Sequence, residues 1–207
     1  MSETARVDAD TGSRTSRAEA QRVRIVAVAI DMFSRQGFRA TSMNEIAAAV
    51  GLSKPTLYHY FASKEMLLVH IYTAVLDESL DDGRRVIAAA PDPLSAIRDL
   101  IAARVVYTCR NSALLKVCFE EEHELPADLQ PALLIRRRAF EDLFTDTVNA
   151  HLTVHPEALG GVAPKVWVNT CLGAINWCYK WYRPSGPAGP AELGAQIATS
   201  LTAGLRA

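Results

Sequence analysis

The sequence has few of the residues that mark disordered, fibrous or disulfide-built proteins. Its 207 residues include only 11 Gly and 10 Pro, which excludes a collagen-like or low-complexity chain. Its four cysteines form no C-x-x-C pair and no regular spacing, which excludes a disulfide framework and favours a reducing, cytoplasmic compartment. The N-terminus lacks the apolar segment of a signal peptide, and polar residues interrupt the longest apolar-rich stretch, residues 166–182. We therefore expect neither secretion nor a membrane span.

The sequence also has no large excess of either charge: it contains 22 Lys and Arg and 23 Asp and Glu, which gives a net charge of −1. This balance excludes a whole-chain polycation, but the charges are segregated. Residues 1–16 hold two basic and three acidic residues (net −1), residues 17–64 hold seven and three (net +4), and residues 65–207 hold 13 and 17 (net −4). A small basic unit followed by a larger acidic one indicates an N-terminal unit for a polyanion.

Serine caps and glycine stops predict four helices in the basic unit and its continuation. The predicted N-caps are Ser16, Ser42, Ser53 and Ser63, and the first two have Glu three residues later, the pattern of a capping box. Gly37 and Gly51 mark the ends of the first and second helices. Residues 1–16 are polar, with almost nothing apolar, and predict a mobile arm.

The acidic unit is also predicted to be helical. Helices are predicted at about residues 94–107, 112–124, from the Leu125–Pro126 break to 152, 164–182 and 191–205. Breaks that contain proline or glycine separate all of them except the first two. No alternating strand pattern and no internal repeat is present. The predicted fold class is all-α.

Three short helices, the second and third joined by Val50-Gly51-Leu52-Ser53, make a helix-turn-helix pattern. The helix N-termini at Ser42, Ser53 and Ser63 would present free N–H groups to phosphates. The third helix offers polar groups for phosphates or base edges at Lys54, Thr56, Tyr58, His59 and Tyr60. These features predict binding to double-stranded DNA.

A longer ordered string carries a family resemblance. It consists of Phe33, Gly37, Thr41-Ser42, Ile46-Ala47, Val50-Gly51-Leu52-Ser53, Thr56-Leu57-Tyr58, Tyr60-Phe61, Ser63-Lys64-Glu65 and Leu67. It resembles the N-terminal domain of TetR-type transcriptional regulators over about residues 20–68. The resemblance implies a homodimeric repressor that binds a pseudo-palindromic operator and is released by a small molecule. It divides the chain into a disordered arm (1–16), a helix-turn-helix domain (17–64) and a helical effector-binding and dimerisation domain (65–207).

The resemblance assigns two kinds of DNA contact by position. Positions facing bases or the major groove are Asn44, Lys54, Pro55, Thr56 and His59. Positions facing phosphates or the DNA backbone are Thr41, Ser42, Tyr58, Tyr60 and Lys64. Other interpretations stay open: the two tyrosines as core residues, His59 as a solvated side chain, and Lys64 as a surface charge.

A second, shorter resemblance concerns the effector. Leu172-Gly173-Ala174, Asn176-Trp177, Trp181-Tyr182-Arg183-Pro184 and Gly186 are similar to a segment of TetR-type regulators of lipid, steroid and aromatic-acid catabolism, several of which respond to acyl-CoA thioesters. The helical domain combines large apolar side chains with a few polar ones, which suits a ligand with an apolar body and an anionic end. Effector contacts are predicted at Arg104, Tyr107, Leu115, Phe119, His123, Phe140, Phe144, Asn176 and Trp177. We predict a hydrophobic carboxylate or its CoA ester.

Several alternatives remain. A drug-sensing repressor of an efflux gene and a ligand-free DNA-binding protein both fit the helix-turn-helix pattern. A helical metalloenzyme would need more than the single Glu120-x-x-His123, which is half of a di-iron motif. Because nucleophile-elbow, P-loop and dinucleotide patterns are also missing, we predict no enzyme, no cofactor and no metal.

Three features of the helical domain keep two interpretations each. Arg136 to Arg138 form either a solvated face or a site for an anionic effector or partner helix. Trp177 and Trp181, four residues apart, belong either to the core or dimer contact or to the effector pocket. The last two predicted helices are the expected dimer interface, where Gly173 and Ala174 would let two backbones approach each other.

Overall fold

Apart from the start of the first helix, the chain folds into helices at about the places where its caps and breaks predict them. The computed structural model describes residues 3–205, with side chains from residue 17. Its elements in that range are α1 (Glu3–Gln36), α2 (Met43–Val50), α3 (Lys54–Tyr60), α4 (Lys64–Ala89), α5 (Pro93–Arg110), α6 (Ser112–Glu120), the 3₁₀ turn η1 (Glu122–Glu124), α7 (Gln130–Val154), α8 (Pro164–Trp181) and α9 (Pro190–Thr202). The all-α prediction is confirmed.

The caps of the helix-turn-helix segment form as predicted. The Ser42 hydroxyl accepts a hydrogen bond from Glu45 N (3.2 Å), and the Glu45 carboxylate accepts one from Ser42 N (2.8 Å), which completes the capping box. These two hydrogen bonds hold the pKa of Glu45 below its ordinary value. Gly51, with φ 73°, ends α2 in the left-handed region, where a side chain would be strained.

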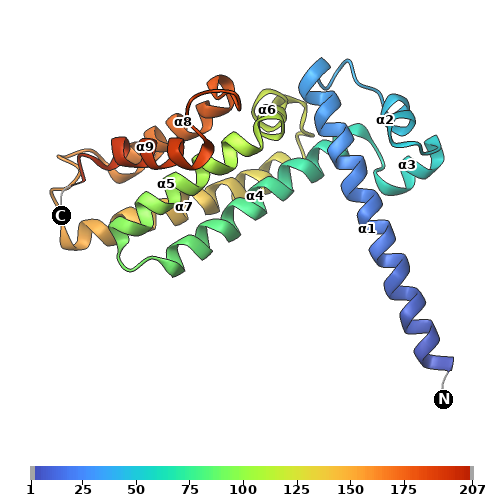
Figure 1. The fold of residues 1–207 in the computed structure, drawn as a ribbon, viewed down its shortest axis with the longest axis horizontal. Helices are drawn as coiled ribbons and strands as arrows, with labels where there is room; N and C mark the ends of the chain where they lie inside the picture. The colour runs from blue at the N-terminus through green and yellow to red at the C-terminus, as the bar shows by residue number, and fades with distance from the viewer. Residues whose placement is uncertain (1–2, 206–207) are drawn as a thin grey trace.

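The first helix begins much earlier than predicted. Ser16 and Glu19 lie inside a continuous helix that starts at Glu3, so the predicted capping box is not a helix start and the predicted arm is helical from residue 3. The C-terminal half of α1 is anchored in the core by Ile25 and Phe33, and extending an anchored helix over a proline-free segment avoids the cost of nucleation. Figure 1 shows this N-terminal part of α1 projecting away from the other helices. Residues 1 and 2 of the predicted arm lie outside the described residues.

The buried apolar residues of the described chain form two cores, and the first core extends beyond the predicted domain boundary between residues 64 and 65. One joins α1, α2 and α3 to the first half of α4 and also includes Val117, Cys118, Leu125 and Leu133 from further along the chain. The other is built from α5, α7, α8 and α9. In Figure 1, α4 runs from beside α1 into the helical domain, so it connects both parts.

The helical domain is built around α5. Both α8 and α9 pack on this helix, as do α4 and α7. At Gly194 of α9 the contact is so close that an added Cβ would lie 2.8 Å from the Ala102 carbonyl oxygen of α5. Within the described residues we find no helix that combines the length and the apolar character needed to cross a bilayer.

Candidate DNA interface and effector cavity

The exposed surface of α2 and α3 gathers most of the residues predicted to contact DNA. Ser42 and Asn44 are exposed on α2, and Lys54, Pro55, Thr56, Tyr58 and His59 are exposed on or beside α3. A depression of about 400 Å³ lies between α2, α3 and the start of α4, lined among others by Asn44, Lys54, Tyr58 and Lys64. Leu57 and Phe61 are buried on the opposite side of α3, as expected of its core face. Tyr60 is half-buried, with its ring 5.9 Å from the Arg22 guanidinium.

Thr41 does not belong to this exposed surface. Its side chain is 1% exposed, its hydroxyl donates to the Gly37 carbonyl (2.9 Å), and it accepts a hydrogen bond from Gln36 Nε2 (3.1 Å). The expectation that Thr41 touches a phosphate is therefore corrected: its side chain braces the loop between α1 and α2. The family resemblance gave Thr41 and Ser42 the same role beside a phosphate. It could not show that Thr41 is buried and Ser42 is exposed.

Lys64 also has a structural role that the sequence did not reveal. Its ammonium group donates to the carbonyl oxygens of Phe38 and Thr41, each at 2.7 Å, and lies 4.3 Å from the centre of the Phe38 ring. These contacts tie the loop between α1 and α2 to the start of α4. Because an ammonium group has three N–H donors, one remains for the predicted phosphate contact, which stays a prediction.

Replacing Lys64 by methionine should lower the free energy of unfolding by about 2 kcal/mol, because two partly buried carbonyls lose their donor. The matched change Lys54→Met should leave it within about 0.5 kcal/mol, since Lys54 is exposed. Urea unfolding followed by circular dichroism measures both. Equal stability of the two variants would contradict the structural role of Lys64.

The loop between α1 and α2 is also bonded to the helical domain through η1 and Glu121, the residue before it. Phe38 N donates to Glu121 Oε1 (3.0 Å), and Arg39 forms an ion pair with Glu124. Nearby, Lys116 Nζ of α6 donates to the Ser34 carbonyl of α1 (2.6 Å). The DNA-binding part is thus bonded at three points to residues more than 80 positions along the chain.

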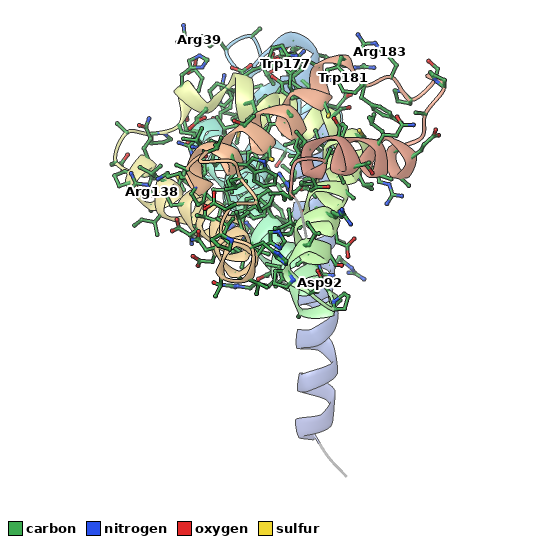
Figure 2. The ribbon with its side chains drawn as sticks, turned by 90° about the vertical axis from the view of Figure 1, so that its left-hand side faces the viewer. Arg39, Asp92, Arg138, Trp177, Trp181 and Arg183 are labelled. Atoms are coloured by element: carbon green, nitrogen blue, oxygen red, sulfur yellow. The ribbon has the colours of Figure 1, made fainter. Side chains whose placement is uncertain are left out.

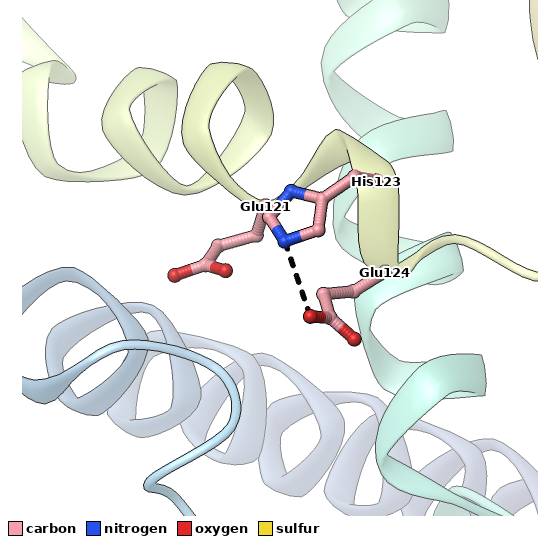
Figure 3. A group of neighbouring side chains, drawn as sticks. All are labelled: Glu121, His123 and Glu124. Carbon is pink, nitrogen blue, oxygen red and sulfur yellow. Dashed lines mark ion pairs between the residues drawn. The ribbon is translucent and has the colours of Figure 1, made fainter.

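The Glu120-x-x-His123 pair does not have the geometry of a metal-binding helix, because α6 ends at Glu120. Glu120 pairs with Lys180, and His123 Nε2 lies 3.1 Å from Glu124 Oε1, as Figure 3 shows. Glu121, His123 and Glu124 do offer ligand atoms within 4.8 Å of one another. Both glutamates already bond to the loop between α1 and α2, which accounts for their position without an ion.

Two adjoining cavities lie among α4, α6, η1 and α7. The larger, of about 650 Å³, is open to solvent and is lined by residues of η1 and the start of α7, among them Glu122, His123 and Gln130. The smaller, of about 90 Å³, lies deeper, between α4, α5, α6, α7 and α8. They share Tyr72, Phe119 and Arg137, so we call them the outer and inner chambers of one pocket. Burial raises the pKa of Tyr72 to about 12, so its phenol stays neutral.

Most of the residues predicted to contact an effector line this pocket. The inner chamber includes Arg104, Leu115, Phe119, Phe140 and Asn176, and the outer chamber includes Phe119 and His123. Tyr107 lines a small void of about 20 Å³ that Arg104 and Phe140 also line, and its hydroxyl donates to Glu78 (2.9 Å). The roles of these residues remain predictions.

Two of the predicted effector residues lie elsewhere. Phe144 is fully buried in the core of the helical domain, where its ring meets Trp167, and it lines neither chamber. Trp177 is 60% exposed on α8 and lines neither chamber. Sequence reasoning missed Tyr72 and Ser79, which enter the pocket from α4. Arg137 of α7 also lines it, which agrees with the interpretation of Arg136 to Arg138 as a possible site for an anionic effector. Tyr72 falls at a helical spacing with Leu68, Ile71 and Val75, and this periodicity does not distinguish a core face from a cavity wall.

Trp177 instead belongs to an exposed stripe along α8. Val166, Thr170, Gly173, Trp177 and Trp181 recur at helical spacing and are all exposed. Figure 2 shows Trp177 and Trp181 on the outside of the helical domain, well away from Arg138. We call these five residues the α8 stripe. An added Cβ at Gly173 would meet no atom within 4 Å, so the protomer leaves this surface open.

Comparison with known proteins adds two family matches. Residues 25–71 match the family described as bacterial regulatory proteins, tetR family, and residues 90–205 match the Tetracyclin repressor-like, C-terminal domain. The second match alone covers more than half of the chain.

Individual proteins resemble this chain over most of its length. The HTH-type transcriptional repressor KstR2 of Mycobacterium tuberculosis (strain H37Rv) is 24% identical over 190 residues, covering 89% of this chain and 92% of the relative. The TetR family regulator PfmR of Thermus thermophilus superposes with a TM-score of 0.79 at 26% identity, covering 89% and 100% of the two chains. AibR, solved in complex with isovaleryl coenzyme A and operator DNA, gives a TM-score of 0.77 at 22% identity, covering 88% and 98%.

Proposed function

The chain belongs to the tetR family of bacterial regulatory proteins, and on this premise we propose that it is a dimeric repressor released from its operator by a hydrophobic carboxylate or a CoA thioester. The DNA-binding part is the helix-turn-helix of α2 and α3. Its place of action is the cytoplasm, where the chromosome is found. This proposal includes no catalytic step and no resident cofactor.

One observation carries the proposal. The outer chamber is lined by Glu122 and His123 of η1, and their neighbours Glu121 and Glu124 are bonded to the loop that precedes α2. A ligand that displaces η1 therefore acts on the segment that positions the helix-turn-helix. The effect is a shift between two populated arrangements of the DNA-binding parts, one of which matches the operator.

Dimerisation supplies the spacing that an operator requires. Two helix-turn-helix units read successive half-sites when they are roughly 34–36 Å apart, which one protomer cannot arrange. The α8 stripe exposes Val166, Trp177 and Trp181 beside an uncovered Gly173, the type of surface that is covered in an oligomer. We assign this stripe, with the exposed side of α9, to contact with a second copy.

The effector class follows from the pocket and from two relatives. The inner chamber is lined mostly by apolar residues, with the polar groups Arg104 and Asn176 among them. The AibR structure contains isovaleryl coenzyme A, and a solved KstR2 is described as a ketosteroid regulator. The small inner chamber has room for an acyl group, and the larger, open outer chamber has room for the rest of the ligand.

The test begins with an operator fragment, selected from random DNA by the purified protein and then labelled for fluorescence anisotropy. Isovaleryl coenzyme A or free isovalerate, titrated into the complex, should release the DNA. Release by ethidium, a cation, with no response to acids or thioesters would replace this proposal with a drug-sensing repressor.

The coupling through η1 has its own test in Glu124→Gln, which removes the charge that Arg39 pairs with. The variant should bind isovaleryl coenzyme A with unchanged affinity by calorimetry but need about tenfold more of it to release the operator. The control, Glu157→Gln, lies in the exposed turn after α7 and should behave as the parent protein. Parallel losses of ligand binding and release would show that Glu124 supports the pocket rather than the coupling.

A further inference from the structure

Arg104 is a buried cation that is in ion-pair contact with no carboxylate in the part of the chain that the structure describes. The carboxylates of Asp82 and Glu78 act on it electrostatically from further away. Its Nη1 donates to the Ser79 hydroxyl (2.7 Å), whereas its Nε is buried and has no hydrogen-bond partner among the described residues. The guanidinium lies against two aromatic rings, 4.8 Å from the centre of Tyr107 and 5.3 Å from that of Phe140. Burial lowers the pKa of Arg104, although an arginine stays charged at neutral pH.

The other charged groups of the inner chamber are already compensated. Arg137 donates to Glu122 (2.8 Å) and lies 4.0 Å from Glu141. Glu141, the carboxylate that lines this chamber, therefore has its counter-ion in Arg137. A buried charge is costly unless it is paired and hydrogen-bonded. A guanidinium beside a cavity, with a buried Nε that lacks a hydrogen-bond partner and no carboxylate in contact among the described residues, therefore indicates a ligand group that completes it.

The size of the inner chamber limits what reaches Arg104. At about 90 Å³, the inner chamber is much smaller than the outer chamber of about 650 Å³ and accepts only a small part of a ligand. Most of its lining is apolar, including Val75, Leu76 and Leu115. The group that fits is a short apolar segment ending in a hydrogen-bond acceptor.

We propose that the effector carries a free carboxylate at the end of a short apolar segment and that Arg104 binds this carboxylate in the inner chamber. Asn176 supplies a second donor there, and the rest of the effector occupies the outer chamber. This inference rests on the proposed function and narrows it. The effector is a free carboxylic acid or the CoA thioester of a dicarboxylic acid, because the thioester of a monocarboxylic acid would place a methyl group against the guanidinium.

Glutaryl-CoA and valeryl-CoA provide a matched pair of probes, since their five-carbon acyl groups differ only in a terminal carboxylate or methyl. By calorimetry, the wild-type protein should bind glutaryl-CoA at least about tenfold more tightly than valeryl-CoA, as expected for a charge-assisted hydrogen bond. Arg104→Met should reverse this order. Arg138→Met, at an exposed position of α7 (Figure 2), should leave both affinities unchanged. Free glutarate and valerate, compared in the same way, separate the free acid from the thioester.

A second readout distinguishes binding from a structural role. Without ligand, Arg104→Met should melt at or above the temperature of the wild-type protein, because an unpaired buried charge is replaced by an apolar side chain of similar length. A clearly lower melting temperature, with unchanged preference between the two thioesters, would make Arg104 structural and overturn the inference.

The remaining outcomes separate the two proposals. Valeryl-CoA that binds and releases operator DNA as well as glutaryl-CoA does would overturn the carboxylate inference and leave the proposed function standing. Failure of both thioesters and both free acids to bind would overturn the inference together with the proposed effector class.

Discussion

Replacing Gly173 by lysine should leave each protomer folded and lower operator affinity at least about 100-fold. The protomer has open space at Gly173, and lysine is a better helix former than glycine, so folding is not impaired. In a dimer built on the α8 stripe, the same side chain would place a charge between two closely approaching helices. In a dimer, binding of one half-site holds the second unit at a high effective concentration near the other half-site. Separated protomers bind each half-site independently and lose this gain in affinity.

Light scattering and fluorescence anisotropy measure the two parts of this prediction. The Gly173→Lys protein should have the mass of a monomer at micromolar concentration, with an unchanged circular dichroism spectrum. The control is Ala74→Lys at an exposed position of α4, which should stay dimeric and bind the operator normally. A Gly173→Lys protein that remains dimeric would show that the α8 stripe is not the interface.

Replacing Gly194 by valine should destabilise the helical domain by about 3 kcal/mol, the upper end of the range for overpacked sites. An added Cβ would lie 2.8 Å from the Ala102 carbonyl oxygen and 3.3 Å from a Val106 methyl group. The nearest atom belongs to the backbone of α5, so no side-chain rotation relieves the contact and α9 has to move.

The control is Ala74→Val, which adds the same branched side chain at an exposed position of α4, outside the proposed contact with a second copy. It should cost only the difference in helix propensity, below about 1 kcal/mol. Urea unfolding measures both variants. If Gly194→Val and Ala74→Val unfold at the same urea concentration, the close approach of α5 and α9 does not contribute to stability.

The outcomes at Thr41, Lys64 and Trp177 mark the limit of sequence reasoning for the site. Each lies on a helix or loop whose position was predicted well. The contacts of each side chain, however, are not specified by the residues next to it in the sequence. Lys64 bonds to carbonyls 23 and 26 residues away, and α8 presents Trp177 to the outside rather than to the pocket. A helical repeat identifies an amphipathic element, but the choice of neighbour depends on contacts between distant segments.

Local patterns were enough to predict the helices other than the start of α1, the helix-turn-helix and the exposed face of α3, because caps, glycine stops and apolar stripes act between residues a few positions apart. Ser42 with Glu45, and Gly51 after α2, have the same local geometry wherever the rest of the chain lies. The packing of distant segments, which no local pattern specifies, bonds η1 to the loop before α2 and leaves the buried Nε of Arg104, beside a cavity, without a hydrogen-bond partner among the described residues. Burial and pairing of a charge depend on which helices surround it, and that arrangement is a property of the packed chain.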